Sequence, residues 1–310
     1  AYNTGLDFLN NKELDSAIFH FSKAILIDST FSDAYYSRGL CFEKVNIDSS
    51  LSDYTMAYTL DSTNLEPLYK IASIQSSFDI KLAISTYNII ITLDNQSSIS
   101  HYEIGMLEYL EGNIDEAILS FTRALKINPE ARTYNDRGSC YRKLEKFDLA
   151  ISDYLKAIKL DSKIAFIHNN LASTYRKDGQ SKKALKYYSS AILTNPEYSL
   201  AYNNRGSLYI ELNDFENAVI DIDKSIALEP DYASAYNNRG VIKHNNKQYK
   251  DAIIDFDNAI RLKENYAKAY LNRGISKQMI RDEDGACNDW EKAKELGIMV
   301  AKKYLINDCQ

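Results

Sequence analysis

Small and large residues return along the chain at intervals of 33 or 34 positions. One column of small residues holds seven of the 11 glycines and comprises Gly5, Gly39, Ala72, Gly105, Gly138, Ala172, Gly206, Gly240 and Gly274. A second small column follows about 12 residues later, a large column four residues after that, and a mostly alanine column three residues further on. Spacings of four and three residues place side chains on one face of a helix. Each period therefore predicts two helices that approach closely at the small residues.

The large column supplies the side chain that fills the gap between the two helices. Its members are Phe21, Tyr54, Tyr87, Phe121, Tyr154, Tyr188, Ile222, Phe256 and Trp290. Short turns such as Leu212-Asn213-Asp214 or Glu111-Gly112-Asn113 join the helices. Pro129, Pro196 and Pro230 share one column just after the second helix, where a residue without an N–H group ends a helix.

These columns resemble the tetratricopeptide repeat, as the run containing Tyr202, Gly206, Tyr209, Ala218, Ser225 and Pro230 illustrates. The resemblance covers the whole chain in nine units, although repeats two to four run one residue short. It implies an all-α fold, a right-handed α-solenoid or superhelix of helix-turn-helix units, with a concave groove lined by each first helix. We expect a single solenoid over residues 1–310, with the repeats in 1–296. The first repeat begins inside its first helix, so we expect that end to be truncated or frayed.

Five repeats carry an arginine before the first small column and an aspartate before the large column. The arginines are Arg38, Arg137, Arg205, Arg239 and Arg273, and the aspartates are Asp53, Asp153, Asp221, Asp255 and Asp289. The other four repeats lack both residues. This joint occurrence predicts contact between guanidinium and carboxylate, within a repeat or between neighbours. A catalytic pair would occur once in a pocket, so we interpret these pairs as structural.

The resemblance also names inward-facing positions that are candidates for partner binding. Asparagines occupy two adjacent columns of the later repeats, as Asn135, Asn169, Asn203 and Asn237 and as Asn170, Asn204, Asn238 and Asn272. Superhelical members of the family hold an extended peptide backbone with such a ladder, since each amide offers a donor and an acceptor. Tyr36, Tyr69 and Tyr102 form an aromatic stripe in the earlier repeats, and Arg142 and Arg176 add positive charge. The alternatives are local packing for the asparagines and tyrosines and plain solvation for the arginines.

Composition argues against several classes of protein. The net charge of −6 is atypical of nucleic-acid binders, which carry a clustered basic face, and no window approaches the apolar run of a membrane span. The four histidines lie in separate repeats without metal-ligand spacing, and no phosphate loop or nucleophile motif occurs. We therefore expect no enzyme activity, no cofactor and no metal site.

The end of the chain resembles the ends of bacterial envelope repeat proteins. An amphipathic helix at about 297–308 is suited to cover the last repeat. A disulfide between Cys287 and Cys309 would pin this capping helix and would imply an oxidising compartment; two free thiols in the cytosol are the alternative. A cytoplasmic and an envelope location both remain open.

The sequence therefore favours a non-enzymatic protein–protein interaction scaffold. In this interpretation the concave groove binds a peptide segment or helix of a partner protein. Two other hypotheses remain: a structural array that associates with itself, and an accessory region of a larger protein.

Overall fold

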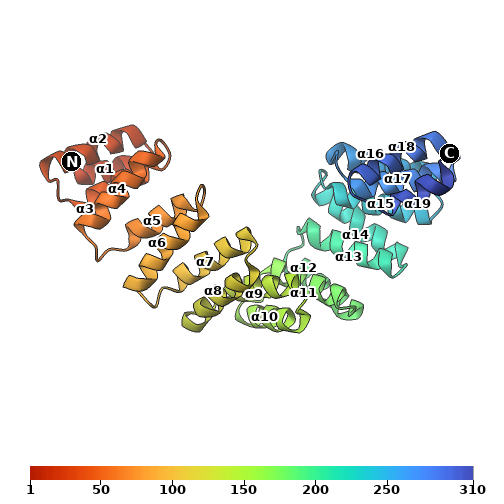
Figure 1. Cartoon of the computed structure of the whole chain (residues 1–310), viewed down its shortest axis with the longest axis horizontal. Helices are drawn as coiled ribbons and strands as arrows, with labels where there is room; N and C mark the ends of the chain where they lie inside the picture. Colours follow the sequence, from red (N-terminus) through yellow and green to blue (C-terminus); the bar gives the residue numbers. More distant parts are fainter. Residues whose placement is uncertain (310) are drawn as a thin grey trace. The chain divides into compact units, whose positions relative to one another are not determined.

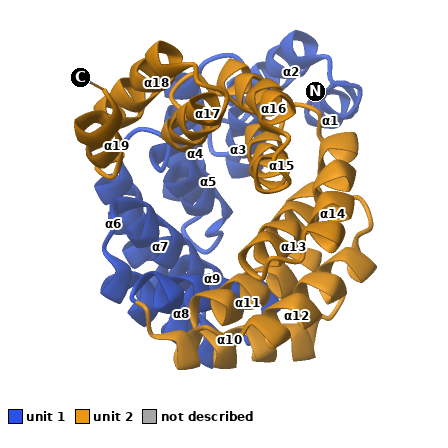
Figure 2. Cartoon of the chain, turned by 90° about the vertical axis from the view of Figure 1, so that its right-hand side faces the viewer, with its two compact units in different colours: residues 1–144 blue, residues 145–310 orange. Residues whose placement is uncertain are grey.

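The computed structural model describes residues 1–309, in which every regular element is a helix (Figure 1). The chain divides into two compact units, residues 1–144 and residues 145–310 (Figure 2). The sequence predicted one continuous solenoid; continuity of the stack across residues 144 and 145 stays a prediction.

Unit 1 contains four complete helix pairs and the first helix of a fifth. Its helices are α1 (Tyr2–Asn10), α2 (Leu14–Ile27), α3 (Ser32–Phe42), α4 (Ile47–Leu60), α5 (Glu66–Gln75), α6 (Ile80–Leu93), α7 (Ser98–Glu111), α8 (Ile114–Ile127) and α9 (Ala131–Lys143). The short repeats two and three have first helices of 11 and 10 residues, α3 and α5, against 13 residues in α13 of repeat seven.

Unit 2 begins with the second helix of repeat five, continues with four helix pairs and ends in one further helix. Its helices are α10 (Phe147–Leu160), α11 (Ala165–Lys177), α12 (Ser181–Thr194), α13 (Ser199–Glu211), α14 (Phe215–Leu228), α15 (Ala233–Asn245), α16 (Tyr249–Leu262), α17 (Ala267–Met279), α18 (Glu283–Glu295) and α19 (Ala301–Asp308). Odd-numbered helices from α1 to α17 are thus the first helices of nine repeats, which confirms the predicted count.

The small and large columns meet as the sequence predicted. A Cβ atom on Gly240 would lie 2.6 Å from the ring of Phe256, and one on Gly39 would lie 2.8 Å from the ring of Tyr54. Both distances are too short for a real side chain, so the glycines are needed for the close approach of the two helices. Phe256 and Tyr54 are 1% and 0% exposed, and the large side chain of the second helix therefore lies at the core of its repeat.

The predicted turns also lie where the sequence placed them. Gly112 and Asn213 have φ values of 87° and 59°, in the left-handed region that glycine and asparagine tolerate best. A residue of this conformation ends the first helix and reverses the chain into the second.

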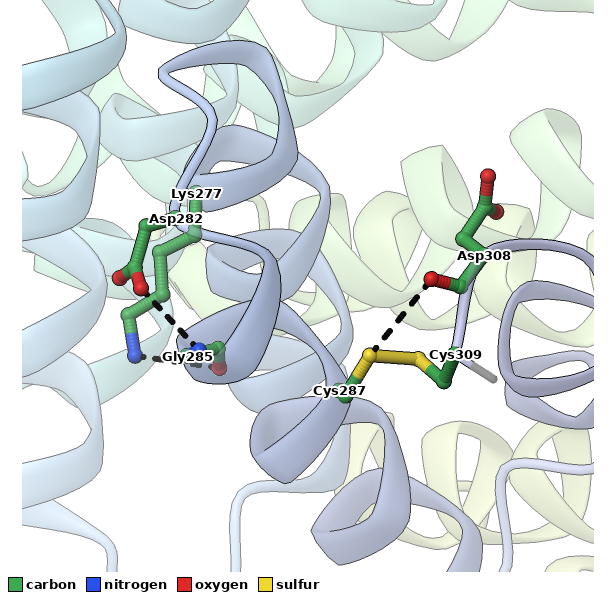
Figure 3. Close-up of a disulfide and its surroundings, with 6 residues drawn as sticks. All are labelled: Lys277, Asp282, Gly285, Cys287, Asp308 and Cys309. Atoms are coloured by element: carbon green, nitrogen blue, oxygen red, sulfur yellow. Dashed lines mark hydrogen bonds between the residues drawn. A yellow bond between two sulfur atoms is a disulfide. The ribbon is translucent and has the colours of Figure 1, made fainter.

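The capping helix was predicted at about 297–308. It is shorter than expected and begins at Ala301 as α19. Trp290 of α18 is fully buried, and its ring stacks on Tyr304 of α19 with centroids 4.9 Å apart. A disulfide joins Cys287 of α18 to Cys309, with 5.8 Å between the two Cα atoms (Figure 3). The cap is therefore held by an apolar contact and by a covalent bond.

Candidate functional site

Unit 2 presents one surface made of first helices. Helices α11, α13, α15 and α17 contact one another in that order, and each also packs on the second helix of its own repeat. Figure 2 shows α13, α15 and α17 lining one side of this unit, with α14, α16 and α18 on the other. We call the solvent-facing residues of α11, α13, α15 and α17 the first-helix face.

Arginine–aspartate pairs fix the first helices to the second ones. Arg205 donates through Nε and Nη2 to the two carboxylate oxygens of Asp221, at 2.7 and 2.8 Å. Its third nitrogen, Nη1, reaches Ser189 of the preceding repeat at 2.8 Å. The ring of Tyr202 lies 6.0 Å from the guanidinium carbon. One arginine therefore ties together three helices, which explains why arginine and aspartate occur together.

The same bidentate geometry recurs in three further repeats. The pairs are Arg38 with Asp53, Arg239 with Asp255 and Arg273 with Asp289. Each of these aspartates is at most 4% exposed, so the pairs are internal to the fold. This confirms the predicted contacts; the fifth pair, Arg137 and Asp153, has one member in each unit and stays a prediction.

The two asparagine columns have different environments. Asn169, Asn203 and Asn237 are 3–5% exposed, so their side chains lie below the first-helix face rather than on it. Each accepts a hydrogen bond through Oδ1 from the other column of the next repeat. The donors are Asn204, Asn238 and Asn272, whose Nδ2 atoms lie at 3.0, 2.9 and 3.0 Å. The buried column therefore orients the half-exposed one.

The orientation leaves each half-exposed amide ready for one more partner. One N–H of each amide donates to the buried column, and its Oδ1 accepts no hydrogen bond within the described residues. The residues concerned are Asn204, Asn238 and Asn272. We call these three residues the asparagine ladder. Asn170 occupies the equivalent position in α11 and is also half-buried. Asn135, in α9 of unit 1, is 5% exposed and donates to Asp136 at 2.9 Å.

The tyrosine stripe of unit 1 packs within a repeat at Tyr36 and against the following repeat at Tyr69 and Tyr102. Tyr36 lies against Tyr54 with ring centroids 5.5 Å apart, and the hydroxyl of Tyr69 is 2.6 Å from Oγ of Ser97. Tyr102 donates to Asp136 of the next repeat at 2.9 Å. All three rings are half-buried, which agrees with the packing alternative; contact with a partner stays a prediction.

The two arginine candidates differ in their neighbours. Arg176 bonds both carboxylate oxygens of Glu211, and its Nη2 also lies 2.9 Å from Oγ of Ser207. Arg176 is therefore not plainly solvated, because it forms an ion pair across two repeats; its role in partner binding stays a prediction. Arg142, in α9 of unit 1, is half-exposed, and its role in binding stays a prediction.

Acidic side chains take the ladder position in repeats four and five. Glu103 and Asp136 lie two residues before the small column, where the later repeats have asparagine. Burial raises the pKa of both carboxyls, although hydrogen bonds from Tyr102 and Asn135 lower that of Asp136. A carboxyl whose pKa is raised by folding destabilises the folded state when it is ionised.

Asp136→Asn is therefore expected to stabilise the chain near neutral pH. The amide still accepts a hydrogen bond from Tyr102, and no charge has to be buried. The gain in Tm is roughly 1–3 °C near neutral pH, and it shrinks as the pH falls through the folded pKa toward the ordinary value of 3.8. Thermal melts near neutral pH and at about pH 4 measure this, with the exposed Asp7→Asn as the control. A gain that persists unchanged in acid contradicts the assignment.

The sequence reasoning missed a pocket on the first-helix face. It lies between α15 and α17, has a volume of about 90 Å³, and is lined by Val241, His244, Phe256, Asn272 and Ile275. The signal was present in the column one residue after the small column, where Ser173 and Ser207 give way to Val241 and Ile275.

Other kinds of site are not evident among the described residues. No three side chains of histidine, cysteine, aspartate and glutamate gather within residues 1–309 in a way that could hold a metal ion. No described helix combines the length and apolar character needed to cross a membrane.

Family models described as tetratricopeptide repeat match five stretches of the chain. The matched residues are 98–131, 131–163, 153–186, 200–232 and 222–254. A comparison with curated proteins finds no match.

Solved structures of low sequence identity share the helical-repeat fold. The Cut9–Hcn1 hetero-tetramer of the APC/C aligns with a TM-score of 0.65 and 16% identity, over 100% of this chain and 75% of that one. PilF of Pseudomonas aeruginosa aligns with a TM-score of 0.60 and 19% identity, over 68% and 98%. YrrB, described as a TPR protein with an unusual peptide-binding site, aligns with a TM-score of 0.49 and 22% identity, over 59% and 95%.

Proposed function

Because this chain is a tetratricopeptide-repeat protein, a fold that typically serves as a protein-interaction scaffold, we propose that its first-helix face binds an extended segment of a partner protein. The observation that carries the proposal is the asparagine ladder. Its amides are held by buried asparagines, so little side-chain freedom is lost when a partner binds. Each leaves a carbonyl oxygen for a backbone N–H of the bound segment.

A ladder of this kind recognises backbone and is tolerant of side chains. An extended peptide presents a donor and an acceptor at every residue other than proline, whereas a folded helix has already used them. The ladder therefore suits an extended segment better than a helical one. The proposed function is binding of the segment, without nucleophilic or metal-dependent chemistry.

Replacing two residues of the asparagine ladder is expected to weaken capture of the partner strongly. Asn204→Ala combined with Asn238→Ala removes two acceptors that contact the segment, and at about 1 kcal/mol for each net hydrogen bond the affinity falls roughly 30-fold. The measurement is affinity capture from extracts of the source cell with wild type and variant side by side. Asn217→Ala with Asn258→Ala, on the second helices α14 and α16, is the matched control and retains capture.

Unchanged capture by Asn204→Ala with Asn238→Ala, the ladder variant, would contradict binding of the partner at the first-helix face. Circular dichroism of each variant shows whether the helices persist, because the ladder residues also bond Asn169 and Asn203.

Self-association is a second candidate, and one observation favours it. Ile220 and Ile254 are 66% and 57% exposed at equivalent positions of α14 and α16. Exposed apolar residues that recur on neighbouring helices can pack against a second copy. Sedimentation across a range of concentrations distinguishes the two: a monomer at all concentrations supports partner binding, and an assembly that Ile220→Lys dissolves supports the array.

A further inference from the structure

The pocket between α15 and α17 differs from the rest of the first-helix face. Phe256 is 1% exposed and forms its floor, while Val241 and Ile275 are half-exposed on the two neighbouring first helices. Asn272 of the ladder also lines it. The asparagine ladder therefore reaches an apolar pocket at repeats eight and nine.

The equivalent place in repeats six and seven is closed by polar side chains. There Nη2 of Arg176 bonds Oγ of Ser207 at 2.9 Å, and Oγ of Ser173 lies 3.0 Å from the hydroxyl of Tyr188. Valine and isoleucine replace both serines at the pocket. The pocket therefore differs in lining from the equivalent place in repeats six and seven.

The pocket also carries no net charge. Two lysines of its helices, Lys243 and Lys277, form ion pairs with the buried Asp255 and Asp289, at 2.7 and 2.9 Å. Nδ1 of His244 lies 2.8 Å from Oγ of Ser276, and burial lowers the pKa of His244, so the ring is neutral near neutral pH. A neutral, apolar side chain therefore fits this lining, and a charged one does not.

We propose that the pocket is a specificity subsite that takes one aliphatic side chain, of about leucine size, from an extended segment of a partner protein. The inference rests on the proposed function, since Oδ1 of Asn272 is the acceptor for the backbone of that same segment. The ladder supplies affinity for any extended chain, and the pocket selects the register in which the chain binds.

The probe is a displayed library of random linear peptides, selected on the whole chain. Selected peptides are expected to share one aliphatic position. Changing that residue to alanine removes three carbons from a buried site, and binding weakens roughly 50-fold. Fluorescence anisotropy of the labelled peptides measures the dissociation constants.

A double-mutant cycle assigns the effect to the pocket. Val241→Asp puts a charge into the lining of the pocket. In this variant, changing the aliphatic residue of the peptide to alanine is expected to alter the affinity less than threefold, because the two residues interact in the wild type. Ile275→Gln is the second variant, in case one of the two disturbs α15 or α17. Ile254→Gln, exposed on α16, is the control and keeps the full sensitivity.

The outcomes separate the subsite from the proposed function. The first outcome concerns peptides that bind Asn204→Ala with Asn238→Ala more weakly than wild type. If these peptides share no aliphatic position, or if both pocket variants still bind them more weakly once that position is alanine, the subsite is overturned and the proposed function stands. Selected peptides that the ladder variant binds as well as wild type does, or no selected peptides, overturn the proposed function and the subsite with it.

Discussion

Replacing Asp221 by alanine is expected to destabilise unit 2 by about 3 kcal/mol. Asp221 is 3% exposed, and within residues 1–309 its one bonding partner is Arg205. Its removal leaves a guanidinium that is 20% exposed without its carboxylate. The hydrogen bond to Asp221 raises the pKa of Arg205 in the wild type. Without Asp221 a guanidinium still keeps its proton at every ordinary pH, so the positive charge cannot be relieved by loss of a proton.

The double change Asp221→Leu with Arg205→Leu is expected to cost less than the single change. Two leucines of similar volume leave no buried charge, and such replacements are often neutral. Urea unfolding gives the free energy, and hydrogen exchange of α14 localises it, because repeat arrays can depart from two-state unfolding. Asp223→Ala is the control: its side chain is 54% exposed in an ion pair with Arg239, and about 0.5 kcal/mol is expected.

Equal losses in the single and double variants would contradict this account of the pair. Such a result would mean that the aspartate acts through its own packing, and the joint occurrence of arginine and aspartate would then need another explanation.

Loss of the Cys287–Cys309 disulfide is expected to destabilise the last repeat by about 3 kcal/mol, from closure of a loop with a sequence separation of 22. The bond holds α19 over Trp290, whose ring Tyr304 covers. Cys287→Ser therefore speeds hydrogen exchange in α18 and α19 and leaves α11 to α14 unchanged. Reductant has the same effect on wild type and none on the variant.

Thiol titration of the unfolded chain checks the bond itself. Of the four cysteines, Cys41 and Cys140 are free, so two thiols react before reduction and four after. Four reactive thiols in protein purified without reductant would contradict the disulfide. Such bonds persist in oxidising compartments, so the added stability is confined to those conditions.

The fold followed from the sequence because its determinants repeat. Gly240 and Phe256 are one instance of a contact that recurs at Gly5, Gly39, Gly105, Gly206 and Gly274, and a column of nine members averages out local exceptions. The Arg205–Asp221 pair was predictable for the same reason, since both residues appear or disappear together. Burial was harder to predict: Asn203 and Asn204 are adjacent and identical, yet one lies below the first-helix face and the other on it.

Features that occur once could not be predicted in this way. The ion pair of Arg176 with Glu211 joins two repeats at positions where other repeats differ, so no column indicates it. The pocket at Val241 and Ile275 depends on what is absent, namely the polar side chains that close the equivalent place at Ser173 and Ser207. Only the folded structure shows whether side chains fill the space between two first helices.

Site-specific photo-crosslinking tests the central claim most directly. A benzophenone amino acid replaces Ser207 on α13 in one variant, on the first-helix face, and Ile220 on α14 in another, on the opposite side of unit 2. The account predicts that a peptide selected on the chain crosslinks to the variant at Ser207, and that Asn204→Ala with Asn238→Ala abolishes the product. Crosslinking from Ile220 alone, or a product at Ser207 that the ladder variant leaves unchanged, would contradict it.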